Sequence, residues 1–364
     1  MKYIAFFSML IVLLISETLY AQTYVAQVKM SNGKWGYINI AGDMIVPAKF
    51  DKCFPFSCNL AAIYDNVTSQ FYFINSKGEQ IHIQGESGST EPAIYKIKDT
   101  YLYTSLFSDY VFGDVRFSDG LIPVKNMKWG YINDSGKVSI PFLYSDVTDF
   151  NGGYATAYRK TKFVILDVHG KETPINIPEL KDVSYFSEGL ASFETFDAQK
   201  GYVDTKGNIV ISATFKSVGN FHGGAAWAKT QDGKVGFITK SGAWLVKPVF
   251  AAAHDFDPES GLALVKFEDG KWEYIDASGK CMAVDTDFYK DFKNGLAVGE
   301  RKGKFGFFNS KGEWAIKPQF DDVRHFKNGY AAAKLGSKWG IIDKKGNWII
   351  SPVFEGIKDM EVVE

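Results

Sequence analysis

One short motif recurs along most of the chain, and it restricts the fold more than any other feature. The segment Lys34-Trp35-Gly36-Tyr37-Ile38-Asn39 returns as Lys128-Trp129-Gly130-Tyr131-Ile132-Asn133, and near the end as Lys338-Trp339-Gly340-Ile341-Ile342-Asp343. Most aligned copies follow one another at intervals of 33 to 37 residues. A fixed period of this length predicts an array of one structural unit rather than two or three ordinary domains.

Two further markers define the unit. A glycine stands six residues after the place of the motif glycine in all nine copies: Gly42, Gly78, Gly136, Gly170, Gly207, Gly242, Gly279, Gly312 and Gly346. A phenylalanine followed by glycine and a small residue precedes most motifs, as in Phe186-x-x-Gly189 and Phe326-x-x-Gly329. Some units depart from the motif: Lys200 and Val235 replace the tryptophan, and Val164 and Glu273 replace the following glycine. We expect those four units to pack differently.

The sequence of each unit predicts that it contains three short strands. The first follows the Phe-x-x-Gly marker, the second is the Trp-Gly-Tyr-Ile segment, and the third is of the type Ile45-Val46-Pro47-Ala48-Lys49-Phe50. The Asp/Asn-x-x-Gly sequence between the second and third suits a turn with glycine at positive φ. Proline cannot donate a ladder hydrogen bond, so the third strand should be short or lie at a sheet edge. The motif glycine is expected to let another backbone approach closely.

These features predict an all-β array of nine three-stranded units. We expect an elongated, twisted superhelix resembling a β-solenoid, with a closed β-propeller as the alternative. An insertion is predicted at about residues 84–110. The spacing from the turn glycine to the next marker phenylalanine is 14 residues in most units, but it is 39 from Gly78 to Phe117. A loop over 85–92 and added strands near 95–98 and 101–103 are expected within it.

The first 21 residues have the features of a secretory signal. Lys2 precedes an apolar run from Tyr3 to Ile15, and Ala21 is a suitable cleavage residue. The run is too short to span a bilayer comfortably. We therefore expect residues 22–364 to form a secreted or periplasmic bacterial protein with no membrane span.

Composition excludes some partners. The formal net charge is −1, so no electrostatic argument favours nucleic acid or anionic lipid as the main partner. The cysteines Cys53, Cys58 and Cys281 are too few and odd in number for a disulfide framework, although the first two could bridge a turn. Cys281 is expected to be a small buried residue.

No residue pattern predicts a catalytic centre, a metal site or a cofactor. The histidines His82, His169, His222, His254 and His325 show no metal-ligand spacing, and isolated solvated or turn positions are expected for them. No phosphate-binding loop or Gly-x-Ser-x-Gly elbow occurs. We expect a protein that is not an enzyme.

Two rows of side chains remain as candidate surfaces. Asp149, Asn220, Asp255 and Asp291 precede unit phenylalanines, and stacking would bring them near one another as a cation groove or as paired carboxylates. Turn capping by solvated side chains is the alternative, and the stronger one. The aromatic residues of the second strands, such as Trp35, Tyr37, Trp129 and Tyr131, form the other row, which is either exposed for stacking on sugars or, more in keeping with its regularity, buried between units.

The repeats resemble the WG-repeat, or KWG-repeat, family of bacterial proteins across residues 22–364. The resemblance implies an interaction or envelope module, and it carries no shared activity or catalytic residue. We therefore expect an exported, non-enzymatic binding or scaffold module of the cell envelope, with an unknown protein or glycan as its partner. One alternative is a glycan-binding protein that uses exposed aromatic rows. Another is a carbohydrate-active enzyme with Asp149, Asp255 or Asp291 as groove carboxylates about 5–10 Å apart.

Overall fold

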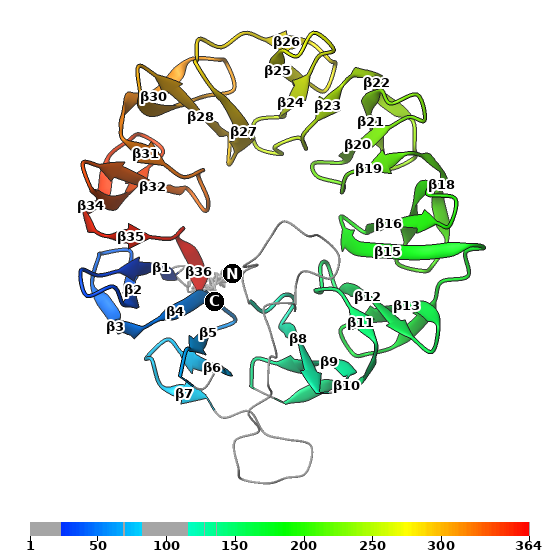
Figure 1. Ribbon diagram of the computed structural model, residues 1–364, viewed down its shortest axis with the longest axis horizontal. Coiled ribbons are helices and arrows are strands. Elements are labelled where there is room, and N and C mark those ends of the chain that lie inside the picture. Colours follow the sequence, from blue (N-terminus) through cyan, green and yellow to red (C-terminus); the bar gives the residue numbers. More distant parts are fainter. Residues whose placement is uncertain (1–22, 68–69, 82–115, 127, 136, 364) are drawn as a thin grey trace, which may run out of the picture.

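The computed structural model describes residues 23–67, 70–81, 116–126, 128–135 and 137–363, and every regular element in these ranges is a β-strand. The strands form nine separate antiparallel sheets arranged in a ring (Figure 1). This arrangement is a nine-bladed β-propeller. The predicted signal segment at 1–21 and the predicted insertion at about 84–110 lie outside the described residues.

We number the blades along the chain. Blade 1 is built from β1–β3 with the C-terminal strands β35 and β36, blade 2 from β4–β7 and blade 3 from β8–β10; blades 4 to 9 take four consecutive strands each, from β11–β14 to β31–β34. The first strand of a blade lies nearest the middle of the ring (Figure 1). The inner strands are β4 (Lys52–Ser57), β11 (Asp146–Val147), β15 (Leu180–Ser187), β19 (Ser217–Val218), β23 (Ala252–Ala253), β27 (Tyr289–Lys293), β31 (Asp322–Val323), β35 (Gly356–Ile357) and β36 (Glu361–Val363).

The two middle strands carry the markers of the repeat. Second strands are β1 (Thr23–Lys29), β5 (Leu60–Asp65), β8 (Leu121–Asn126), β12 (Tyr154–Arg159), β16 (Leu190–Thr195), β20 (Ala225–Lys229), β24 (Leu262–Lys266), β28 (Leu296–Arg301) and β32 (Tyr330–Leu335). Third strands are β2 (Trp35–Asn39), β6 (Gln70–Asn75), β9 (Lys128–Asn133), β13 (Lys162–Asp167), β17 (Lys200–Asp204), β21 (Val235–Thr239), β25 (Trp272–Asp276), β29 (Lys304–Phe308) and β33 (Lys338–Asp343).

The outer strands form the circumference. They are β3 (Met44–Phe50), β7 (Gln80–Ile81), β10 (Val138–Tyr144), β14 (Glu172–Pro174), β18 (Ile209–Phe215), β22 (Trp244–Phe250), β26 (Cys281–Met282), β30 (Trp314–Phe320) and β34 (Trp348–Phe354). Each lies at the edge of its sheet, as the proline in this segment predicts. Of the six outer strands with seven residues, only β18 has no proline.

The solenoid and the three-stranded unit are both wrong predictions. Most units contain a fourth, innermost strand, which is only two residues long in blades such as 4, 6 and 9. Two residues carry no alternating pattern, so sequence periodicity does not show them. The closed propeller, given as the alternative, is confirmed.

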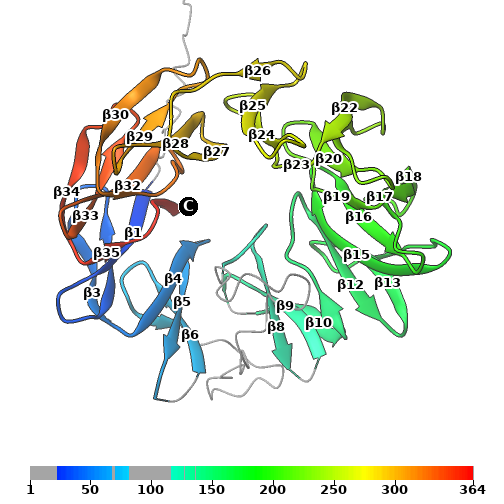
Figure 2. The same ribbon diagram turned by 45° about the horizontal axis from the view of Figure 1, so that its top comes forward.

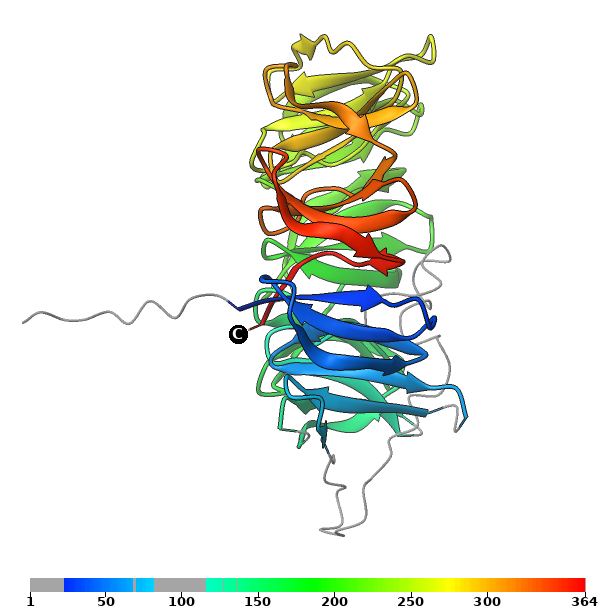
Figure 3. The same ribbon diagram turned by 90° about the vertical axis from the view of Figure 1, so that its left-hand side faces the viewer.

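Closure of the ring joins the two ends of the described chain. β1 pairs with β35 through Val28 and Ile357, and with β36 through Thr23 and Val363. The turned view in Figure 2 and the edge-on view in Figure 3 both place these strands side by side. Ile357 and Met360 are buried against Ala26 of β1. The C-terminal segment therefore supplies the inner strand that blade 1 lacks.

Aromatic contacts join each blade to the next. Tyr37 of β2 lies 4.7 Å, centroid to centroid, from Phe56 of blade 2, and its hydroxyl donates a 2.7 Å hydrogen bond to the carbonyl of Phe54. Tyr131, Tyr202 and Tyr274 make the same pair of contacts with the blades that follow them. Phe237 and Phe307 keep only the ring contact. The regular aromatic row is thus core between blades.

The motif glycine determines the length of the outer strand. A Cβ built at Gly36, Gly130, Gly201, Gly236, Gly306 or Gly340 would lie 2.4–2.6 Å from a carbonyl oxygen of the outer strand, where the pairing contains a bulge. The six blades with this glycine have outer strands of seven residues. Blades 2, 4 and 7, with Tyr72, Val164 and Glu273 in its place, have described outer strands of two or three residues. Different packing is confirmed for the units with Val164 and Glu273. It is wrong for the units with Lys200 and Val235, whose outer strands have the usual seven residues.

Gly236→Ala should destabilise the protein by about 1–3 kcal/mol, the usual cost of overpacking. The added Cβ would lie 2.6 Å from the carbonyl oxygen of Val246 and 2.7 Å from the nitrogen of Pro248, and neither backbone atom can move away easily. The measurement is the midpoint of urea unfolding. Glu273→Ala, at the matching position of blade 7, should stay within about 0.5 kcal/mol. Equal midpoints for the two variants would contradict the role given to the glycine.

Ile357→Ala tests the closure of the ring. The side chain is 1% exposed against β1, so we expect a loss of about 2–5 kcal/mol of unfolding free energy. Val353→Ala, at an outer position that is 61% exposed, is the control and should be nearly neutral. If both variants unfold at the wild-type midpoint, the C-terminal strand contributes little to closing the ring.

Candidate functional site

Each blade buries one large side chain at the same place on or beside its inner strand. These are Phe56, Phe117, Phe150, Phe186, Phe221, Phe256, Phe292, Phe326 and Met360, all less than 8% exposed. The residue just before it differs from blade to blade. It is polar and half-buried in every blade except blade 2. We call the six such residues of blades 5 through 9 and blade 1 the inner arc: Tyr185, Asn220, Asp255, Asp291, His325 and Asp359.

Side chains of the inner arc reach the neighbouring blade. Nδ2 of Asn220 lies 2.6 Å from the hydroxyl oxygen of Tyr185. Nε2 of His222 lies 3.5 Å from Oδ2 of Asp255, and Nδ1 of His254 lies 2.6 Å from Oδ1 of Asp291. Three successive blade junctions, from blade 5 to blade 8, are therefore bridged by polar contacts between inner strands.

Burial and neighbouring charges shift the pKa values of the arc. The hydrogen bond that His254 makes to the carboxylate of Asp291 raises the pKa of His254 against the opposing effect of partial burial. Burial also raises the pKa of Asp255, although His222 and Lys293 act in the opposite direction. For His325, burial and the nearby Lys290 lower the pKa. The pKa of His325 in the inner arc and the pKa of His254 beside it are therefore shifted in opposite directions.

The predicted acidic row is brought together in part. Asp255 and Asp291 interact with each other and with His254, as stacking of the units predicts. Asn220 pairs with Tyr185 instead. Asp149 holds the equivalent position in blade 4, next to the arc. The turn-capping alternative is therefore wrong for Asp255 and Asp291, which contact other blades.

The expectation of isolated histidines is wrong for three of the five. His222, His254 and His325 lie on or beside the inner strands of blades 6, 7 and 9. His169 is a turn residue, as expected, and its amide donates to Asp167; His82 lies outside the described residues. Their sequence positions, within two residues of a unit phenylalanine, are the signal that would have placed them together.

The arc offers proton donors and acceptors but no assembled metal site. Among the described residues, no group of three or more His, Cys, Asp or Glu side chains is placed to hold a metal ion. An imidazole held by a carboxylate, like His254 by Asp291, has a fixed orientation and a tuned affinity for protons. Such groups can bind polar or charged ligands.

The repeat family named "WG containing repeat" matches residues 35–66, 129–158, 201–234, 236–272, 305–339 and 339–361, which is more than half of the chain. The chain belongs to the WG-repeat family. No curated protein matches the sequence.

Solved structures with some similarity to this WG-repeat propeller are all distant. Apo AztD from Citrobacter koseri is 10% identical with a TM-score of 0.41, over 94% of this chain and 98% of that one. BamB from Moraxella catarrhalis is 15% identical with a TM-score of 0.35, over 67% and 83%. The computationally designed protein Ika8 is 10% identical with a TM-score of 0.39, over 82% and 95%.

The aromatic row of the WG repeats is not an exposed sugar-stacking surface. Tyr37, Tyr131, Tyr202 and Tyr274 are at most 1% exposed. The motif tryptophans carry cationic side chains on their rings; Lys266, for example, lies 5.8 Å from the ring centre of Trp272. Trp244 is 38% exposed and packs edge-on against Phe215. Burial, the alternative favoured by the regularity of the row, is confirmed for these tyrosines and for Trp129, whereas Trp35, Trp272 and Trp339 are half-buried.

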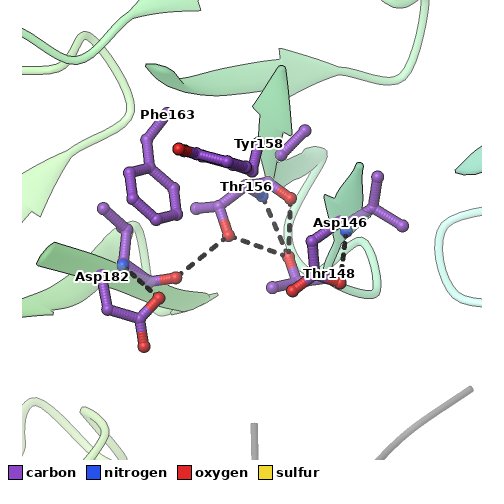
Figure 4. A pocket seen from close by; sticks show the side chains of 9 residues that line it. Asp146, Thr148, Thr156, Tyr158, Phe163 and Asp182 are labelled. Atoms are coloured by element: carbon purple, nitrogen blue, oxygen red, sulfur yellow. Dashed lines mark hydrogen bonds between the residues drawn. The ribbon is translucent and has the colours of Figure 1, made fainter. Parts of the chain in front are cut away.

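A small cavity lies between blades 4 and 5 (Figure 4). Thr148 and Thr156 line it, and the hydroxyl of Thr156 donates to the carbonyl of Ser184 at 3.1 Å. Its volume of about 10 Å³ matches roughly one water molecule. The cavity is therefore a packing feature of this junction.

No disulfide joins Cys53, Cys58 or Cys281. Cys53 packs against the core between blades 1 and 2, whereas Cys58 packs against the core between blades 2 and 3, so they face opposite sides of β4. Cys281 is exposed on the outer strand β26, and the expectation that it is buried is wrong. This strand is short because Glu273 replaces the motif glycine. No helix in the described part of the chain is long and apolar enough to cross a bilayer.

Asp291→Asn should lower the pKa of His254, because the neutral amide no longer stabilises the imidazolium. The pKa of His254 is raised in the folded protein, so its stabilising contribution is complete below pH about 6.5 and is lost as the pH rises through the raised value. NMR titration of the imidazole resonances measures the shift. Asp285→Asn, an exposed partner of Arg301, is the control. A His254 titration that is identical in all three proteins would contradict the interaction.

Proposed function

We propose that this WG-repeat propeller is a non-enzymatic binding module of the bacterial cell envelope and that the inner arc is its binding surface. The partner is a protein or glycan of the envelope. We infer export from the predicted signal at residues 1–21. We infer a non-enzymatic role because the sequence contains no recognised catalytic pattern.

The observation that carries this proposal is the contrast between adjacent positions of the repeat. The buried position is phenylalanine in eight blades and methionine in one, as the fold requires. The position before it varies in residue type, yet it is polar in eight consecutive blades, from blade 3 through blade 9 to blade 1. Packing of the blades does not explain that choice.

The arc also contains polar atoms that the fold leaves without partners. Oδ1 of Asp255, Nδ1 of His325 and Oδ1 of Asp359 are buried and form no hydrogen bond with any residue that the structure describes. Each such group costs about 1–3 kcal/mol of stability. Violations of this kind in native proteins are typical of functional sites.

The alternative of a carbohydrate-active enzyme receives less support. Its two carboxylates would be Asp255 and Asp291, which lie close to one another. Both are engaged by histidines of the preceding blade, at 3.5 Å and 2.6 Å. Glycoside hydrolysis instead needs one carboxyl group as a proton donor and the other as a nucleophile or base.

The test is affinity capture from an envelope extract with immobilised residues 22–364. Three proteins are compared: the wild type, the arc variant Asp255→Ala/Asp359→Ala, and the charge-matched control Asp285→Ala/Glu313→Ala. Asp285 and Glu313 are exposed and lie outside the arc. We expect at least one component that the wild type and the control retain and the arc variant loses by about tenfold or more. Equal retention by all three would contradict the arc as the binding surface, and chemical conversion of a retained component would contradict the non-enzymatic role.

A further inference from the structure

A second row of side chains lies one position before the inner arc. In blades 7, 8, 9 and 1 this position is basic in every case, and we call the four residues the basic row: His254, Lys290, Arg324 and Lys358. The described residues at the same position in blades 4, 5 and 6 are Thr148, Ser184 and Gly219. Four consecutive basic residues at one repeat position are specific to one side of the ring.

Aromatic rings support three members of the basic row. His254 packs edge-on against Trp272 with a centroid distance of 5.1 Å. Arg324 and Lys358 each lie 5.8 Å from the ring centre of a motif tryptophan, Trp339 and Trp35 respectively. Cations held over rings lose less freedom when they bind an anion, because their positions are already restricted.

More basic groups surround the row. Lys266 and Lys334, at the ends of the second strands, lie on the same rings of Trp272 and Trp339. Within the described residues, Lys290, Arg324 and Lys358 have no carboxylate oxygen within 4.0 Å, whereas twelve lysines and arginines elsewhere do. The cations of the row therefore keep most of their charge available to a ligand.

The acidic residues nearby do not cancel this charge. Asp291 is bonded to His254, and Asp255 faces His222. Asp359 is near His325, whose pKa is also influenced by Lys290, Asp291 and Lys293. The basic row together with Lys266, Lys293 and Lys334 thus outnumbers the three aspartates of the inner arc, Asp255, Asp291 and Asp359.

We propose that the basic row of blades 7, 8, 9 and 1 binds a linear polyanion, whose successive anionic groups contact successive blades. This inference rests on the proposed binding function and specifies the chemistry of the partner. Repetition of a cation at one position in four neighbouring blades matches a ligand that repeats its charge along its length. Phosphate, carboxylate and sulfate groups share the chemistry that Arg324, Lys290 and Lys358 recognise.

The experiment measures binding of residues 22–364 to three probes: inorganic polyphosphate, polygalacturonate and heparin. The basic-row variant Arg324→Ala/Lys358→Ala is compared with Lys311→Ala/Lys345→Ala, which removes two exposed lysines from the turns between the third and outer strands of blades 8 and 9. We expect at least one probe to bind at low salt and to weaken as salt is added. The basic-row variant should bind that probe about tenfold more weakly, and the control should match the wild type.

The three probes distinguish phosphate, carboxylate and sulfate as the recognised group. Arg324→Gln/Lys358→Gln, which keeps the side chains long, serves as a second variant if the alanine variant unfolds at a lower temperature than the control. No binding of any probe at low salt would overturn the inference, and so would equal weakening in the basic-row and control variants. If the arc variant loses a captured component while no polyanion binds, the proposed function stands and the polyanion does not.

Discussion

The structure depends on one aromatic contact that is repeated around the ring. At six of the nine junctions, the aromatic residue two positions after the place of the motif tryptophan lies 4.6–4.9 Å, centroid to centroid, from the phenylalanine of the next blade. Where this residue is tyrosine, its hydroxyl also satisfies a carbonyl of the next inner strand. A single blade has two apolar faces, and each needs a neighbour. The contact that holds two blades together therefore also requires that each blade be followed by another blade.

That constraint explains how far the fold could be predicted from the sequence. The unit, its second and third strands, the turn glycine and the edge position of the proline all follow from local chemistry, and the structure has them. Gly242 illustrates this: its φ is +82°, and a Cβ there would lie 3.3 Å from Ile211 of the preceding blade. Open stacking and a closed ring both satisfy these local requirements. The contact that distinguishes them, Val28 with Ile357, occurs once and belongs to no period.

The candidate site was partly predictable for a related reason. Asp255 and Asp291 could be placed together because they share a repeat position. The position of His254 near these aspartates was not predicted, because His254 precedes Asp255 by one residue and its contact with Asp291 crosses to the next blade. A comparison of all nine units position by position separates the two kinds of residue. Positions that hold the blades together recur, as Phe186 and Phe221 do, and the adjacent positions vary from blade to blade.

The prolines of the outer strands have a consequence for the behaviour of the protein in a crowded compartment. Every blade ends in an edge strand, and an unpaired edge can recruit a strand from another molecule and begin aggregation. Proline removes one donor from that edge in five of the six long outer strands. β18 lacks it, and its residues Ile209 and Val210 are 47% and 41% exposed. Among the described outer strands of full length, this segment is the least protected against edge-to-edge association.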